Sequence, residues 1–164
     1  NLSGDMSQSV LDHALSIEAE QVVEINDQFI PTGELVSVQG GPLDFKTVKT
    51  IATNIHDPQL ENSLGYDHCY VFNHNGNLKK VATVVEPTSG RKMHVLTTSP
   101  GMQFYSGNLL AGTFGKNKNI YPKHGGFCLE TQLFPDAPNH SHFSPAVLTP
   151  EEDFKATTIY AFEW

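Results

Sequence analysis

The sequence has few basic residues and no long apolar run, and each shortage argues against a class of protein. Its 10 Lys and Arg residues are outnumbered by 18 Asp and Glu, which gives a formal net charge of −8. The basic residues do not cluster, so a nucleic acid would be repelled and is not an expected partner. No stretch approaches the roughly 20 apolar residues that cross a bilayer, and the first residues lack the pattern of a signal peptide. We therefore expect a cytoplasmic protein with no membrane partner.

Cysteine is also scarce. Only Cys69 and Cys128 occur, and each lies among apolar or aromatic neighbours instead of in a disulfide framework or a metal-ligand pair. We expect two buried free thiols.

Histidine is more frequent, with eight in the chain, and it invites a metal interpretation. The spacing argues against a metal. His140-Ser141-His142 would place two rings on one face of a strand, but neither a helical histidine pair nor a cysteine pair accompanies it. We expect no metal and no cofactor, and we expect solvated or core histidines at positions that include His68, His74, His94 and His124.

Period-two alternation between turn signals dominates the chain, which is typical of an antiparallel all-β protein. Strands are predicted where Leu15 and Ile17 alternate with polar residues, at 33–38, and at 158–164, where the last strand must pair with another. The clearest hairpin spans 78–97, with Val81, Thr83 and Val85 at alternate positions and a turn at 87–90.

Helix signals are weak. Short helices are predicted at 7–15 and at 45–55, the second after a possible Asp44 cap. Residues 149–152 fit a capping box, but their closeness to the final strand favours a turn. The chain contains no repeat or linker, so it is one domain or part of one, and a large β-sandwich can need more chain than 164 residues.

Three segments place polar residues among aromatics, glycines and prolines: 65–70, 99–108 and 125–132. Glu130 follows Phe-Cys-Leu, so we expect it to be partly desolvated and suited to general-base chemistry. The alternative is a salt-bridged strand residue. Asp67 and Gln103 can hydrogen-bond a polyhydroxylated ligand. Their alternatives are an Asp that caps a turn and a strand Gln that points outward.

Together these segments resemble the aldose 1-epimerase (galactose mutarotase) family. The resemblance rests on Gly-Tyr-Asp-His at 65–68, Pro-Gly-Met-Gln-Phe-Tyr-Ser-Gly-Asn at 100–108 and Tyr-Pro-Lys-His-Gly-Gly-Phe-Cys-Leu-Glu-Thr-Gln at 121–132. Further landmarks lie at 10–13, 30–34, 42–45 and 135–137, so the resemblance covers essentially the whole chain. The residue after the Asp-His pair departs from the family, which commonly has asparagine where this chain has Cys69.

The resemblance implies a large antiparallel β-sandwich and a cofactor-free enzyme that interconverts the α and β anomers of free hexoses such as galactose and glucose. In that family a glutamate takes the proton of the anomeric hydroxyl and a histidine protonates the ring oxygen. Glu130 matches the base, and Asp67 and Gln103 match residues that hydrogen-bond the sugar hydroxyls.

The family's acid histidine precedes a stretch that Asn1-Leu2-Ser3-Gly4 resembles, so we expect residues 1–164 to be the C-terminal part of one domain, incomplete on its N-terminal side. The expected partners are a free hexose and either the missing N-terminal half or a second copy of the chain. Resemblance to fungal members suggests that a UDP-glucose 4-epimerase could precede it. The alternative function is a truncated sugar-binding module without catalysis.

Overall fold

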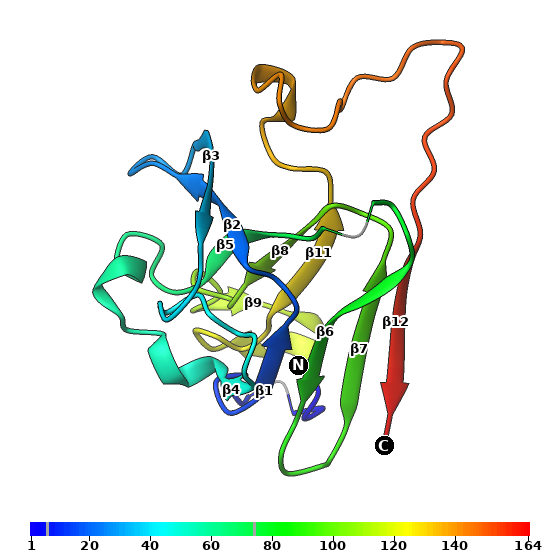
Figure 1. Cartoon of the computed structure of the whole chain (residues 1–164). Helices are drawn as coiled ribbons and strands as arrows, with labels where there is room; N and C mark the ends of the chain where they lie inside the picture. The colour runs from blue at the N-terminus through cyan, green and yellow to red at the C-terminus, as the bar shows by residue number, and fades with distance from the viewer. Residues whose placement is uncertain (6, 74) are drawn as a thin grey trace.

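Two five-stranded antiparallel sheets form most of the computed structural model, which describes residues 1–5, 7–73 and 75–164 (Figure 1). From one edge to the other, the first sheet consists of β12 (Thr158–Glu163), β7 (Lys92–Thr97), β6 (Lys79–Val85), β1 (Ala14–Ile17) and β4 (Lys49–Thr50). The second consists of β11 (Cys128–Gln132), β8 (Gly101–Tyr105), β5 (Asp67–Val71), β2 (Gln21–Ile25) and β3 (Pro31–Ser37).

The remaining elements are short. A two-stranded sheet pairs β10 (Ile120–Tyr121) with β9 (Thr113–Phe114). Single 3₁₀ turns form η1 (Ile51–Asn54), η2 (Pro58–Leu60), η3 (Lys116–Lys118) and η4 (Ala137–Asn139). Within the described residues, no helix has the length and apolar character needed to span a bilayer. The all-β class expected from the alternation is confirmed.

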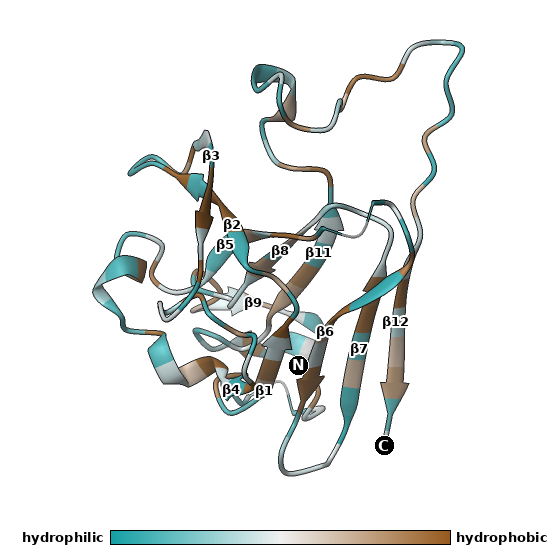
Figure 2. Ribbon diagram, in the orientation of Figure 1, coloured by the Kyte–Doolittle hydropathy of each residue, from teal (hydrophilic) through white to brown (hydrophobic). Residues whose placement is uncertain are grey.

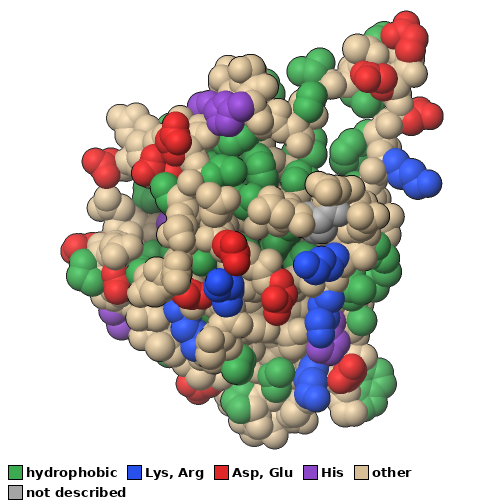
Figure 3. Space-filling model, in the orientation of Figure 1, with side chains coloured by type: hydrophobic (Ala, Val, Ile, Leu, Met, Phe, Trp, Pro, Cys, Tyr) green, Lys and Arg blue, Asp and Glu red, His purple; other side chains and the backbone are tan. Residues whose placement is uncertain are grey.

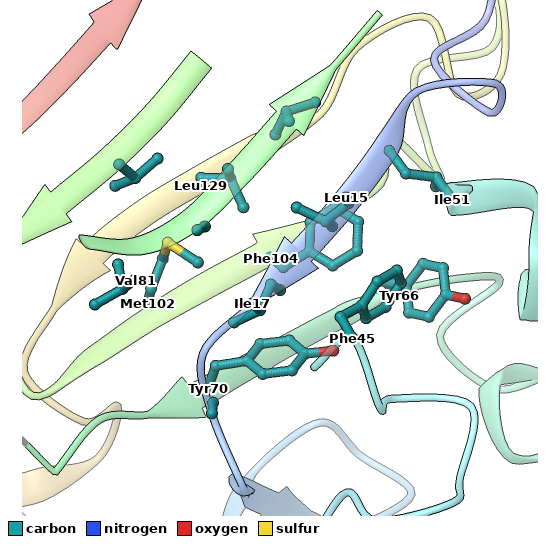
Figure 4. Packing of buried hydrophobic residues seen from close by; sticks show 14 of the residues in the cluster. Leu15, Ile17, Phe45, Ile51, Tyr66, Tyr70, Val81, Met102, Phe104 and Leu129 are labelled. Atoms are coloured by element: carbon teal, nitrogen blue, oxygen red, sulfur yellow. The ribbon is translucent and has the colours of Figure 1, made fainter. Parts of the chain in front are cut away.

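The hydrophobic core lies between the two five-stranded sheets, because both contribute the alternate residues of their strands to one buried cluster. Figure 2 shows hydrophobic residues concentrated on β1, β6, β7 and β11. At the centre, Tyr66 stacks on Phe104 with ring centroids 5.1 Å apart, and Phe45 meets both rings edge to face (Figure 4). Full burial of a side chain such as Phe stabilises the fold by roughly 1.5–3 kcal/mol, so these rings are major contributors.

The hairpin predicted at 78–97 is confirmed as β6 and β7, but its faces differ from simple alternation. The register shifts between Lys80 and Ala82, so Val81 occupies a β-bulge. Val81, Ala82 and Val84 are buried, whereas Thr83 and Val85 are only partly buried. After Val81 the extra residue exchanges the side chains that face the core with those that face outward. The alternation in the sequence does not predict this exchange.

The helices predicted at 7–15 and 45–55 are wrong. Residues 7–13 form turns that lead into β1, and only η1 within 45–55 is helical. Asp44 caps no helix: its carboxylate accepts hydrogen bonds from the backbone N–H groups of Gly40 and Lys46, and so closes a loop. The turn favoured at 149–152 is confirmed, and the Glu152 carboxylate accepts the backbone N–H of Thr149 as in a capping box.

The predicted last strand pairs antiparallel with β7, with Tyr160 opposite Val95. Because β12 is an edge strand, much of its apolar surface faces solvent: Phe162 is 55% exposed, and Trp164, just after the end of the strand, is 95% exposed. Figure 3 shows hydrophobic side chains along this edge of the molecule.

Candidate active site

Glu130 lies on the face of the second sheet that points away from the core. Side chains alternate along β11, so Leu129 enters the core and Glu130 faces out and is exposed. The neighbouring strands place further residues beside it. Gln103 on β8 lies directly opposite Glu130 of β11, and on its other side Gln103 lies opposite Cys69 of β5. Residues from separate motifs therefore meet on one surface.

Asp67 joins the same surface through a side-chain hydrogen bond. The amide Nε2 of Gln103 donates to Oδ1 of Asp67 at 2.7 Å. The two residues lie diagonally across β5 and β8, since Asp67 pairs with Tyr105. The structure thus brings together all three residues that the sequence singled out.

A buried polar network fixes the start of β5, where Asp67 lies. Ser106 Oγ accepts the backbone N–H of Tyr66 at 3.0 Å and donates to Asn108 Oδ1 at 2.6 Å. The Asn108 amide donates to the carbonyls of Ser63 and Tyr66. Gly65 has φ +139°, and a Cβ there would lie 2.5 Å from Asn108 Oδ1, so the close approach requires glycine. These residues connect the 65–70 segment to the 99–108 segment.

A second glycine contact brings in the third segment. Gly107 has φ +70°, and a Cβ on it would lie 2.3 Å from the carbonyl oxygen of Gly126. Any side chain at Gly107 would push away the 125–132 segment that leads into β11. Glycines of the motifs therefore serve packing, whereas Asp67, Gln103 and Glu130 line the open surface.

A pocket of about 340 Å³ opens on this surface. Its volume is at the lower end of the ~300–1,000 Å³ typical of small-molecule sites, which suits one sugar ring better than a polymer. Its polar lining groups are Asp67, Gln103, Glu130 and Gln132, with Cys69 between them. The β2–β3 hairpin and the loop after β11 supply the rest, namely Val23, Ile25, Phe29, Pro31 and Pro135.

Edge contacts from the other sheet hold β11 on both sides of Glu130. The Tyr160 hydroxyl donates to the carbonyl of Leu129 at 2.7 Å, and the hydroxyls of Thr131 and Thr158 hydrogen-bond to each other. Both partners come from β12. The strand that carries Glu130 is therefore fixed from a second direction, although it lies at a sheet edge.

The electrostatic surroundings of the pocket disfavour further negative charge. Burial raises the pKa of the Cys69 thiol to about 11. Burial, and then the carboxylate of Glu130, raise the pKa of Cys128 and of Tyr160. Both thiols and the phenol are therefore neutral near pH 7, and the carboxylates of Asp67 and Glu130 are the acidic groups that line the pocket.

Two expectations about these residues need correction. Glu130 is exposed and not partly desolvated, because strand alternation places its apolar neighbour Leu129 in the core instead. It makes no ion pair with another described residue, so the salt-bridged alternative has no support in that part of the chain. Cys69 is a buried free thiol as expected, but Cys128 is only partly buried because it shares the open face of β11.

Among the described residues, no histidine lines the pocket. His68 is buried, its Nδ1 accepts a hydrogen bond from the backbone N–H of Asp67 at 3.1 Å, and burial lowers its pKa to about 4. His140 and His142 lie in a loop rather than on one strand face, and His142 hydrogen-bonds the Gly33 carbonyl. His74 lies outside the described residues. Across 1–5, 7–73 and 75–164, no group of three or more potential ligands could hold a metal ion.

The sequence interpretation missed Gln132 and the residues of the β2–β3 hairpin that line the pocket. Gln132 is two residues after Glu130 on the same strand, so period two could have placed both side chains on one face. Pro31 and Pro135 lie within the family landmarks at 30–34 and 135–137, whereas Val23, Ile25 and the more exposed Phe29 carried no signal beyond a turn-forming Asn-Asp pair.

The chain is similar to known proteins over a range that includes these segments. The sequence profile of the aldose 1-epimerase family matches residues 1–161. This chain belongs to the aldose 1-epimerase family. It is 41% identical to the galactose mutarotase of Homo sapiens over 163 residues, which cover 99% of this chain and 47% of that protein. It is 36% identical to the aldose 1-epimerase of Escherichia coli K12 over 166 residues, which cover 99% of this chain and 48% of that protein.

Solved structures of the aldose 1-epimerase family share the fold. A GalM/aldose epimerase homologue from C. elegans superposes with a TM-score of 0.83 at 26% identity, covering 99% of this chain and 48% of the other. The galactose 1-epimerase of Lactobacillus acidophilus superposes with a TM-score of 0.77 at 25% identity, covering 95% of this chain and 45% of the other. The large antiparallel sandwich expected from the motifs is thus confirmed. The chain spans about half the length of the curated relatives it matches.

Proposed function

We propose that residues 1–164 are the C-terminal part of one aldose 1-epimerase domain that interconverts the α and β anomers of free hexoses such as galactose and glucose. One observation carries the proposal. Glu130 lies directly opposite Gln103, which is itself hydrogen-bonded to Asp67, at the base of a pocket large enough for one sugar ring. The relatives named galactose mutarotase and aldose 1-epimerase support the same activity.

In the proposed reaction Glu130 accepts the proton of the anomeric hydroxyl as a general base. Its exposed carboxylate is accessible from the pocket. As the O–H bond breaks, the carbonyl forms, the bond from the anomeric carbon to the ring oxygen breaks, and a general acid protonates that oxygen. The aldehyde then rotates and the ring closes on its other face: the hydroxyl at the former ring oxygen returns its proton to the conjugate base of the acid as it attacks the carbonyl carbon, and the carbonyl oxygen takes its proton back from Glu130, which gives the second anomer. The reaction is an isomerisation and needs no cofactor.

Asp67 and Gln103 hold the sugar in place while the ring opens. Their mutual hydrogen bond fixes both side chains before a ligand binds, which reduces the entropy lost on binding. A carboxylate accepts hydrogen bonds from hydroxyls, and an amide can both donate and accept them. The pair is therefore suited to neighbouring hydroxyl groups of one ring.

We assign the acid to a group outside these 164 residues. In the described part of the chain, no histidine lines the pocket, whereas the family uses histidine for this step. The same observation favours a second candidate function, a sugar-binding module that does not catalyse. A 4-epimerase domain on the same polypeptide and a cytoplasmic location stay predictions.

Polarimetry separates the two functions. Freshly dissolved α-D-galactose and α-D-glucose are mixed with the protein as its gene encodes it, and the approach to anomeric equilibrium is followed against buffer alone. An enzyme accelerates both traces and leaves methyl α-D-galactopyranoside unchanged, because this glycoside has no free anomeric hydroxyl. Galactose binding with traces that match buffer would favour the binding module.

A further inference from the structure

Phe29 has a backbone conformation that bulky residues rarely adopt. Its φ is +62°, in the left-handed region, and its side chain is 47% exposed at the tip of the β2–β3 hairpin. Left-handed backbone is unfavourable for a residue with a large Cβ substituent, and such outliers gather at ligand sites where the surrounding structure holds them. The hairpin gains no buried core residue from this phenylalanine, so core packing does not account for a large side chain at this position.

Asn26 holds the strained turn. The Phe29 N–H donates to the Asn26 carbonyl at 2.9 Å, and the Asn26 N–H donates to the Ile30 carbonyl at 2.9 Å. The Asn26 side-chain oxygen accepts the N–H groups of Gln28 and Ile30 at 2.9 and 3.1 Å. Four hydrogen bonds within five residues therefore fix the backbone at Phe29, and with it the direction in which the side chain leaves the chain, before any ligand arrives.

Phe29 lines the proposed sugar pocket. The hairpin and β11 lie on opposite sides of β5 and β8 in the same sheet (Figure 1). Hairpin residues, with Phe29 outermost, form an apolar wall, and the polar groups of β5, β8 and β11 form the floor. The pocket is therefore amphipathic, with aromatic and aliphatic carbon on one side and carboxylates and amides on the other.

A pyranose has matching chemistry. Its hydroxyls radiate from the rim of the ring, while axial hydrogens give at least one face a patch of C–H groups. In galactose the hydrogens on carbons 3, 4 and 5 gather on one face. The electron-rich face of an aromatic ring attracts such weakly positive C–H groups, and the contact removes apolar surface from water.

We propose that Phe29 is a specificity-determining residue, a platform that receives the C–H face of the pyranose while Asp67 and Gln103 hold its hydroxyls. This assignment rests on the proposed function and adds the element that selects among sugars by the apolar face they present. Pyranoses with a continuous C–H face, such as galactose, bind better than those with a hydroxyl in the centre of that face.

The test compares Phe29→Gly, Phe29→Tyr and the matched control Phe114→Ala, all in the protein as its gene encodes it. Glycine removes the ring but accepts φ +62°, so Phe29→Gly keeps or raises thermal stability and a loss of function cannot be attributed to unfolding. Tyrosine retains the platform. Phe114 is 81% exposed on β9 and does not line the pocket.

We expect Phe29→Gly to raise the KM for galactose about 3–10-fold with kcat within about twofold, and Phe29→Tyr and Phe114→Ala to match wild type. An unchanged KM in Phe29→Gly would overturn the proposal that Phe29 is a platform. A loss of activity that appears only in kcat would also overturn it.

A binding readout separates this inference from the catalytic proposal. In a Glu130→Gln background, Phe29→Trp introduces an indole at the wall, and titration with D-galactose should change its emission relative to Glu130→Gln alone. If wild type does not accelerate mutarotation but this emission still responds to galactose, the catalytic function fails and the platform stands. A silent emission at galactose concentrations that saturate binding by calorimetry overturns the platform, whatever the activity.

Discussion

The side-chain amide of Gln103 donates a 2.7 Å hydrogen bond to the carboxylate of Asp67, and Gln103 lies directly opposite Glu130 in the adjoining strand pair. The amide thus connects a carboxylate on β5 with one on β11. Asp67 engages one amide N–H of Gln103, which leaves the second N–H and the carbonyl oxygen available to a ligand. The arrangement explains why an amide, and not a third carboxylate, occupies the middle strand.

Replacing Asp67 tests whether this pair holds sugar hydroxyls. Asp67→Ala leaves Gln103 and the sugar each without a partner, at a cost of about 1–3 kcal/mol, so kcat/KM for galactose should fall roughly 5–150-fold. Steady-state mutarotation of galactose and of its deoxy analogues measures the loss. The loss should shrink for the analogue that lacks the contacted hydroxyl. Asp153→Ala, at an exposed position far along the chain, serves as the control. An equal loss for every analogue would assign Asp67 a purely structural role.

The turn between β6 and β7 provides a pH prediction. The Glu86 carboxylate accepts the backbone N–H groups of Thr88 and Ser89 at 2.9 and 2.6 Å. Hydrogen bonds, first from Ser89 and then from Thr88, lower its pKa to about 2 from the usual 4.5. A carboxyl group with a lowered pKa contributes stability that is fully present above about pH 4.5 and lost as the pH falls towards 2.

Urea unfolding of wild type and Glu86→Gln at several pH values checks this prediction. Wild type should be more stable at pH 7, and the gap should close between pH 4.5 and 2. Glu61→Gln, at an exposed position outside the hairpin, controls for a general loss of charge. A gap that stays constant over this range would show that these hydrogen bonds do not favour the ionised form.

The exposed edge of β12 predicts self-association of the 164-residue chain on its own. Unpaired backbone groups along an edge strand and apolar side chains such as Ile159 and Phe162 form a template for association. Light scattering should give a mass above that of a monomer, rising with concentration. Phe162→Lys should reduce association, because a charge on an edge opposes pairing, and Phe114→Lys should not. A monomer at every concentration would contradict the prediction.

Local patterns predicted the strands well where neighbours in sequence are also neighbours in the sheet. The 78–97 hairpin is an example, since its turn and both strands lie within one segment. The bulge at Val81 could not be predicted, because it depends on how β6 meets β1 and β7 together. The helix expected at 45–55 failed because Asp44 satisfies loop amides rather than helical ones.

The candidate site residues were singled out by their unusual neighbours and assigned by the family resemblance, but their geometry was not predicted. Nothing local to Glu130 shows that it lies beside Gln103, because that contact joins strands far apart in the chain. The same apolar neighbours that suggested desolvation of Glu130 alternate into the core. Phe29 escaped notice because its importance depends on a backbone angle and on strands outside its own hairpin.

The rate of anomer interconversion by Glu130→Gln tests the account most directly. Glutamine keeps the shape of the side chain but cannot accept the proton, and general-base catalysis typically contributes about 10²–10⁴-fold. Polarimetry of α-D-galactose, with Glu34→Gln on an exposed position of β3 as the control, should show kcat reduced by at least about 100-fold and a smaller change in KM. A Glu130→Gln rate within about threefold of wild type, where a loss of about 10²-fold or more is expected, would contradict the assignment of Glu130 as the base.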